Sequence, residues 1–131
     1  MPLPEPQDLS QIIFLGAVRS DGAHLAFVHN GNLHASIELP HRQHHSDAFH
    51  WGYGGSGPAD LALSILDYLT VTLGEKRTVK IRKGKTTHTA WILHHDFKWQ
   101  YVAHFQDDWS ITADEIHRWL QQQRRMGKQK S

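Results

Sequence analysis

The sequence predicts an α+β fold in which a small antiparallel sheet of about four strands is covered by two to three helices. Three observations lead to this prediction. Apolar and polar residues alternate on both sides of Asn30-Gly31, which is typical of a β-hairpin. A leucine-rich segment with helical spacing follows a run of glycines, and a capping box opens a further helix near residue 112.

The length of 131 residues suits one ordinary domain. Pro2, Pro4 and Pro6 fix φ and remove backbone donors, so we expect residues 1–10 to form a flexible leader. Residues 11–126 are predicted to form a single α+β domain, and residues 127–131 a basic tail.

Composition excludes several classes of protein. A net charge of +1 argues against an acidic DNA mimic and against a generally basic nucleic-acid binder. With no cysteine, disulfides, thiolate metal sites and cysteine nucleophiles are excluded. No window holds eighteen apolar residues in a row. We therefore expect a cytoplasmic protein with no membrane partner.

The first half of the chain contains strand patterns followed by a loop. An apolar run at 12–18 predicts the first strand, and residues around Leu25 and Phe27 the second. Leu33 to Leu39 alternate as a third strand after the Asn30-Gly31 turn. From Pro40 to His50 the chain is polar and rich in histidine without a period, which indicates a loop.

The central helix is expected to start at the glycine-rich segment, because Pro58 suits a first helical position. Its apolar stripe runs to Leu73, and Gly74 ends it. Residues 76–85 read as a short edge strand or a loop. Residues 88–95 are predicted as helix, with a hairpin around Lys83-Gly84 as the alternative.

The last part of the chain is expected to contain one strand and one helix. Apolar residues alternate from Phe97 to Phe105, which predicts a strand with one buried face. Thr112 to Glu115 form a capping box. In the helix that it opens, three residues should face inward: Ile116, Trp119 and Leu120.

The segment from Trp51 to Ala59, followed by Leu61, Ala62 and Leu63, resembles a marker of an uncharacterised family of short bacterial, phage and plasmid proteins, with the pattern W-G-Y-G-G-S-G-P-A-x-L-A-L. The resemblance extends to Phe97-Lys98-Trp99 and to Trp109 with the helix start at 112–116. It implies a setting in mobile elements, and thereby a role in host–phage conflict. It implies no catalytic residues.

The glycine-rich segment is the main candidate binding site. Its spacing matches G-x-G-x-x-G, but no buried strand precedes it, so a dinucleotide fold is not expected. Glycine amides leading into a helix N-terminus suit an anion; the alternative is that they only allow tight packing. The predicted site comprises Trp51, Gly52, Tyr53, Gly54, Gly55, Ser56 and Gly57. Trp51 is taken as a ligand wall, whereas Trp99 and Trp119 are expected in the core.

Histidines offer a second candidate site. The loop carries His41, His44, His45 and His50 with Asp47, and a later segment carries His94, His95 and Asp96. Together they have the donor types of a metal site, but no fixed spacing such as H-E-x-x-H. We therefore assign no metal and no cofactor in the leading interpretation.

A basic cluster is the third candidate: Lys76, Arg77, Lys80, Arg82, Lys83 and Lys85. Six positive charges in so short a span suit phosphate contacts, and the alternative is a solvated edge that discourages strand pairing.

The leading functional hypothesis is a non-enzymatic phage or mobile-element accessory protein. It would bind an anionic small molecule such as a nucleotide, or a host defence protein, and act against defence by sequestering a nucleotide signal or blocking a defence complex. Two alternatives stay open: a metal-assisted phosphoesterase using the loop histidines, and a nucleic-acid-binding accessory protein acting through Lys76 to Lys85.

Overall fold

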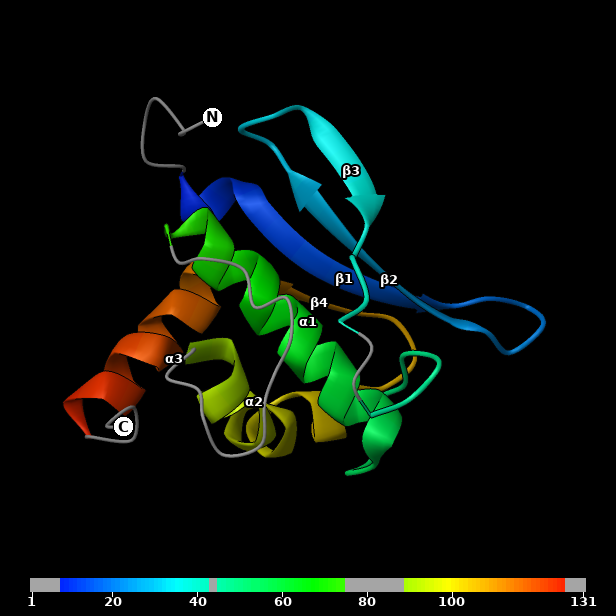
Figure 1. Cartoon of the computed structure of the whole chain (residues 1–131). Coiled ribbons are helices and arrows are strands. Elements are labelled where there is room, and N and C mark those ends of the chain that lie inside the picture. Colours follow the sequence, from blue (N-terminus) through cyan, green and yellow to red (C-terminus); the bar gives the residue numbers. More distant parts are fainter. Residues whose placement is uncertain (1–7, 43–44, 75–88, 127–131) are drawn as a thin grey trace.

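A four-stranded antiparallel sheet forms one layer of the molecule, with the strand order β3-β2-β1-β4. The computed structural model describes residues 8–42, 45–74 and 89–126. Its strands are β1 (Ile12–Val18), β2 (His24–Asn30), β3 (Ala35–Glu38) and β4 (Trp109–Thr112). A short 3-10 helix, Leu9–Gln11, precedes β1. The predicted α+β class is confirmed, with three α-helices beside the sheet in the described residues (Figure 1).

Alternation along the strands gives the sheet one buried face. Phe14 of β1 pairs with Val28 of β2 and with Ile111 of β4, and all three side chains are buried. Because successive strand residues point to opposite faces, these residues share the side of the sheet on which α1 packs. The ring of Phe14 meets that of Tyr68, on α1, edge to face at 5.7 Å between centroids.

Helix α1 (Ser56–Thr72) is the central helix of the molecule, as the leucine pattern predicted. It runs between the sheet and α2 (Figure 1). Leu61, Ile65, Leu66 and Leu69 have no exposed surface. After the C-cap at Leu73, Gly74 adopts a φ of +106°, a conformation that glycine takes at little cost.

Helix α2 (Thr89–Gln100) corrects part of the sequence prediction. The helix expected at 88–95 is present but continues to Gln100, and a 3-10 turn, Val102–His104, follows it. The predicted strand from Phe97 to Phe105 is therefore wrong. Leu93, Phe97 and Tyr101 also recur every four residues, and this helical period is the one that faces the core: Leu93 and Phe97 are buried, Tyr101 is partly buried, and the rings of Phe97 and Tyr101 stack at 5.0 Å.

The position of Trp99 follows from this correction. On a strand its side chain would share the face of Phe97, but on α2 it points elsewhere and is 57% exposed. The expectation that Trp99 lies in the core is therefore wrong. The fourth strand is instead β4, a segment that the sequence analysis did not assign to a strand.

Helix α3 (Ala113–Arg125) begins where the capping box placed it. The Thr112 hydroxyl accepts a hydrogen bond from the amide of Glu115 at 3.1 Å. Ile116, Trp119 and Leu120 are buried as predicted. Of the helices in the described ranges, none has both the length and the apolar character needed to cross a membrane.

Candidate metal centre

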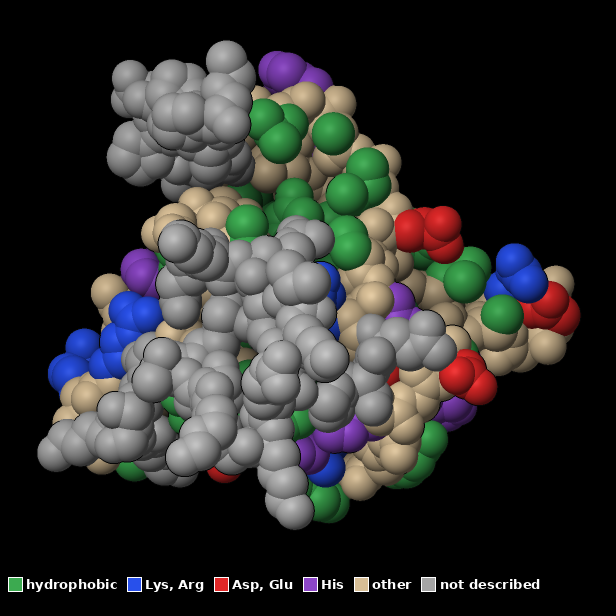
Figure 2. All heavy atoms as spheres, viewed as in Figure 1, with side chains coloured by type: hydrophobic (Ala, Val, Ile, Leu, Met, Phe, Trp, Pro, Cys, Tyr) green, Lys and Arg blue, Asp and Glu red, His purple; other side chains and the backbone are tan. Residues whose placement is uncertain are grey.

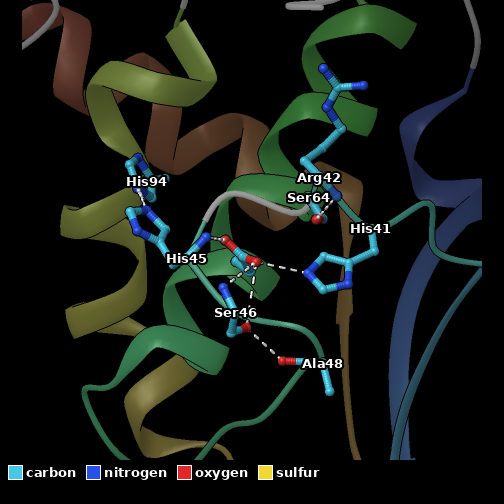
Figure 3. A network of polar contacts seen from close by, with 8 residues as sticks. His41, Arg42, His45, Ser46, Ala48, Ser64 and His94 are labelled. Carbon is cyan, nitrogen blue, oxygen red and sulfur yellow. Dashed lines mark hydrogen bonds and ion pairs between the residues drawn. The ribbon is translucent and has the colours of Figure 1, made fainter. Parts of the chain in front are cut away.

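Three histidines from two separate parts of the chain meet beside α1. His45 lies in the loop before α1, and His94 and His95 are neighbours on α2. One ring nitrogen from each lies within 4.8 Å of the others. His45 and His94 turn toward each other (Figure 3), with 3.0 Å between their Nε2 atoms. Packing of α2 against α1 thus brings together donors that are 49 residues apart in sequence.

A backbone carbonyl fixes which ring nitrogen of His94 carries a proton. Its side chain is buried, and its Nδ1 lies 2.6 Å from the carbonyl oxygen of Trp91. A carbonyl can only accept, so Nδ1 carries the proton and the Nε2 of a neutral ring keeps its lone pair. Metal-binding histidines commonly donate their second ring N–H to a carbonyl or carboxylate in this way. The lone pair of His94 is therefore aimed at His45.

The buried carboxylate of Asp60 holds the loop that carries His45. Asp60 lies on α1 and has no exposed surface. Its Oδ1 accepts from the amide of His45 at 2.7 Å, and its Oδ2 accepts from the amide of Ser46 at 3.0 Å. His41 Nε2 is 2.8 Å from the same Oδ2. These contacts, drawn in Figure 3, fix the backbone of the loop next to the histidines.

The same loop is fixed to α1 a second time, one turn further along. The amide of Arg42 donates to Ser64 Oγ at 2.8 Å, and its guanidinium lies 3.7 Å from the carboxylate of Asp67. Two α1 residues spaced four apart, Asp60 and Ser64, thus hold both sides of the loop.

The pKa of His95 lies below the ordinary value. Partial removal of the ring from water by its neighbours is the larger cause, although the residue as a whole is exposed, and the positive charge of Lys98 adds to it. Both effects disfavour the imidazolium. His95 is therefore neutral at pH 7, which is the form that coordinates a metal ion.

This arrangement fits a transition-metal ion with one coordination position left for another ligand. Zn²⁺ binds histidine nitrogen at about 2.0–2.1 Å, and catalytic sites use three protein ligands. In tetrahedral geometry this bond length places two nitrogens about 3.3 Å apart, so the 3.0 Å between His45 and His94 must widen only slightly. Imidazole nitrogens are donors that Zn²⁺, Cu²⁺ and Ni²⁺ accept.

The other described residues of the predicted histidine site do not belong to this group of three. His41 is engaged with Asp60. The ring of His50 stacks on that of His24 at 3.8 Å. Asp47 and Asp96 are not part of the group, and His44 lies outside the described residues. The sequence thus predicted the donor types correctly, and the fold brings three of the predicted histidines together.

The glycine-rich segment is packed against aromatic rings. Trp51 is buried, and its indole N–H donates to the carbonyl of Asp107 at 2.9 Å, so it belongs to the core, whereas Tyr53 is half exposed. The space that a side chain at Gly54 would need is filled by Trp99, and at Gly55 by Tyr53. These contacts give the glycines a packing role, and anion binding by their amides stays a prediction. The basic cluster Lys76 to Lys85 lies outside the described residues.

Two residues near the three histidines were given no role in a site by the sequence analysis. Asp60 is a carboxylate inside an otherwise apolar helical stripe, and such a residue indicates a buried polar contact. Lys98 was placed on the polar side of a strand, but on α2 it is buried.

A family model described as a family of unknown function, DUF6166, matches residues 14–80. The match covers β1 from Phe14 onward, β2, β3, the loop with His45 and helix α1; it ends before α2, with His94 and His95, and before β4. Comparison with curated proteins and with solved structures gives no match.

Proposed function

We propose that this chain, which belongs to the DUF6166 family of unknown function, binds a transition-metal ion through His45, His94 and His95. The observation that carries the proposal is the convergence of three imidazole nitrogens within 4.8 Å. The Trp91 carbonyl and the Asp60 carboxylate hold two of the three donors in place. Such outer contacts orient ligands in metal sites.

The activity suited to this donor set is metal-assisted hydrolysis. Three protein ligands leave a position for water, and a bound metal ion lowers the pKa of that water toward neutrality. This supports the phosphoesterase alternative from the sequence, with a different use of the histidines: His45 comes from the loop, and the other two donors come from α2.

Titration of metal-free protein with Zn²⁺ in a calorimeter tests the proposal. We expect one ion per chain, and His95→Ala should weaken binding about tenfold or more because one of three ligands is lost. His95 is exposed, so its removal should leave the fold intact. His117→Ala, on α3, is the matched control and should bind Zn²⁺ like the wild type. Equal affinities in both variants, or no stoichiometric binding, would contradict the proposal.

The finer parts of the leading sequence hypothesis also remain proposals: a cytoplasmic location, a mobile-element setting, and an anti-defence role through a nucleotide or a host protein. An anti-defence role is compatible with a metal site. A metal-assisted phosphoesterase could hydrolyse a nucleotide signal, whereas the leading hypothesis has the protein sequester it. A mass spectrum of small molecules that co-purify with the protein tests the nucleotide directly.

A further inference from the structure

Lys98 is a buried cation, and no anionic partner for it lies among the residues that the structure describes. Its side chain is only 6% exposed, and its ammonium group lies 4.4 Å from the ring centroid of Trp99. It forms no ion pair or hydrogen bond with any residue that the structure describes. A buried charge is costly unless it is paired, and an aromatic ring compensates only part of that cost. The position of Lys98 therefore favours an anion beside it.

The candidate metal centre lies one helical turn away. His95 and Lys98 are three residues apart on α2, so their side chains are neighbours on the helix surface. Figure 2 shows histidine side chains next to a Lys or Arg side chain low on this face, in the region of α2 in Figure 1. Two positive groups, the metal ion and the ammonium, would thus lie next to each other on α2.

The chemistry of the anion follows from this pairing. A phosphoryl group carries several charged oxygens, so one can bind the metal ion while another accepts from an ammonium, as in many phosphate sites. The half-exposed ring of Trp99 lies beside this ammonium and packs against Gly54.

We propose that the metal ion and the Lys98 ammonium together bind the phosphoryl group of a phosphate ester, with one oxygen at the open metal position and another on Lys98. This inference rests on the proposed metal site and adds the class of substrate to it. In this role Lys98 is a substrate-binding residue, whereas His45, His94 and His95 bind the metal.

Two calorimetric titrations test this proposal on the full chain: Zn²⁺ into metal-free protein, and then inorganic phosphate into the zinc-loaded protein. Lys98→Met keeps the length of the side chain and removes its charge. We expect it not to weaken Zn²⁺ binding, because it removes a positive charge beside His95, and to weaken phosphate binding about tenfold or more. Lys98→Arg keeps the charge and should retain phosphate binding. Arg118→Met, on the exposed side of α3, is the control and should change neither affinity.

The outcomes separate this inference from the metal site. If Zn²⁺ binds and Lys98→Met binds phosphate like the wild type, the phosphate proposal is overturned and the metal site stands. If the wild type binds no Zn²⁺, the metal site is overturned, and with it the joint site proposed here. Loss of phosphate binding in Lys98→Met together with normal binding in Lys98→Arg supports the proposal. Thermal midpoints of all variants are measured alongside, to check that each variant folds.

Discussion

The ring of Trp99 occupies the space that a side chain at Gly54 would fill. This contact joins the glycine-rich loop before α1 to the exposed end of α2, so a change on either side should be felt on the other. It also places the loop next to the ring on which Lys98 rests.

Gly54→Ala should therefore destabilise the protein by displacing the Trp99 ring. Forcing a methyl group into an occupied space costs about 1–3 kcal/mol, and because Trp99 is half exposed and can move outward, we expect the lower end. Urea unfolding of Gly54→Ala, Trp99→Ala and the double variant measures the coupling. If the cost of Gly54→Ala is the same with and without Trp99, the ring is not its cause.

Thr112→Ala should lower the free energy of unfolding by about 1 kcal/mol, because it removes the side-chain cap of α3. The hydroxyl of Thr112 accepts a hydrogen bond from the amide of Glu115, and the methyl side chain of alanine cannot accept one. Thr112→Ser keeps the hydroxyl and is the matched control. A midpoint for Thr112→Ala equal to that of Thr112→Ser would show that the cap contributes nothing to stability.

Local patterns predicted most of the elements correctly where one period dominated. β1 and β2 alternate over seven residues each, and α1 is apolar over most of its surface. Around residue 97 the same apolar residues fit two periods. The spacing of Phe97, Trp99 and Tyr101 fits a strand, and the spacing of Leu93, Phe97 and Tyr101 fits a helix. Packing against α1 decides between them, and packing is not visible in a single sequence.

The fourth strand could not be read from local sequence because it depends on one distant residue. β4 has only four residues, and its Trp109 lies over Gly16 of β1, where a side chain would collide with the indole ring. Glycine at position 16 and tryptophan at position 109 thus form one unit across the sheet. No local pattern around either residue predicts that the two are in contact.

The candidate metal centre was likewise predictable in part. The sequence named His45, His94 and His95 among eight possible ligands, but their selection depends on how the loop is fixed to α1 by Asp60. Lys98 was expected on the strand predicted from Phe97 to Phe105, and because that segment begins as helix, the expected position of its side chain was wrong. Residue types were thus predictable, whereas their juxtaposition needed the fold.

The phenol of Tyr101 should ionise later than an ordinary tyrosine. Its pKa is raised, mainly by burial and further by the negative charge of Glu115. Above about pH 10, the ordinary tyrosine value, the unfolded chain loses this proton before the folded one does, so the free energy of unfolding falls as pH rises. Tyr101→Phe should make that fall shallower in urea unfolding between about pH 9 and pH 11. A fall as steep as in the wild type would contradict the raised pKa.

Asp60→Asn should weaken both the fold and the metal site, because Asp60 accepts hydrogen bonds from the amides of His45 and Ser46. An asparagine would turn an N–H group toward at least one of these donors. Leaving buried donors unsatisfied costs about 1–3 kcal/mol, and outer contacts of this kind contribute about 10–100-fold to metal affinity. We therefore expect a lower midpoint in urea and at least a tenfold weaker affinity for Zn²⁺.

Asp67→Asn is the matched control for this prediction. Asp67 is a second buried carboxylate of α1 and pairs with Arg42, so its substitution should lower stability with a smaller change in Zn²⁺ affinity. Equal losses of Zn²⁺ affinity in the two variants would mean that Asp60 acts only through stability, and not by positioning His45.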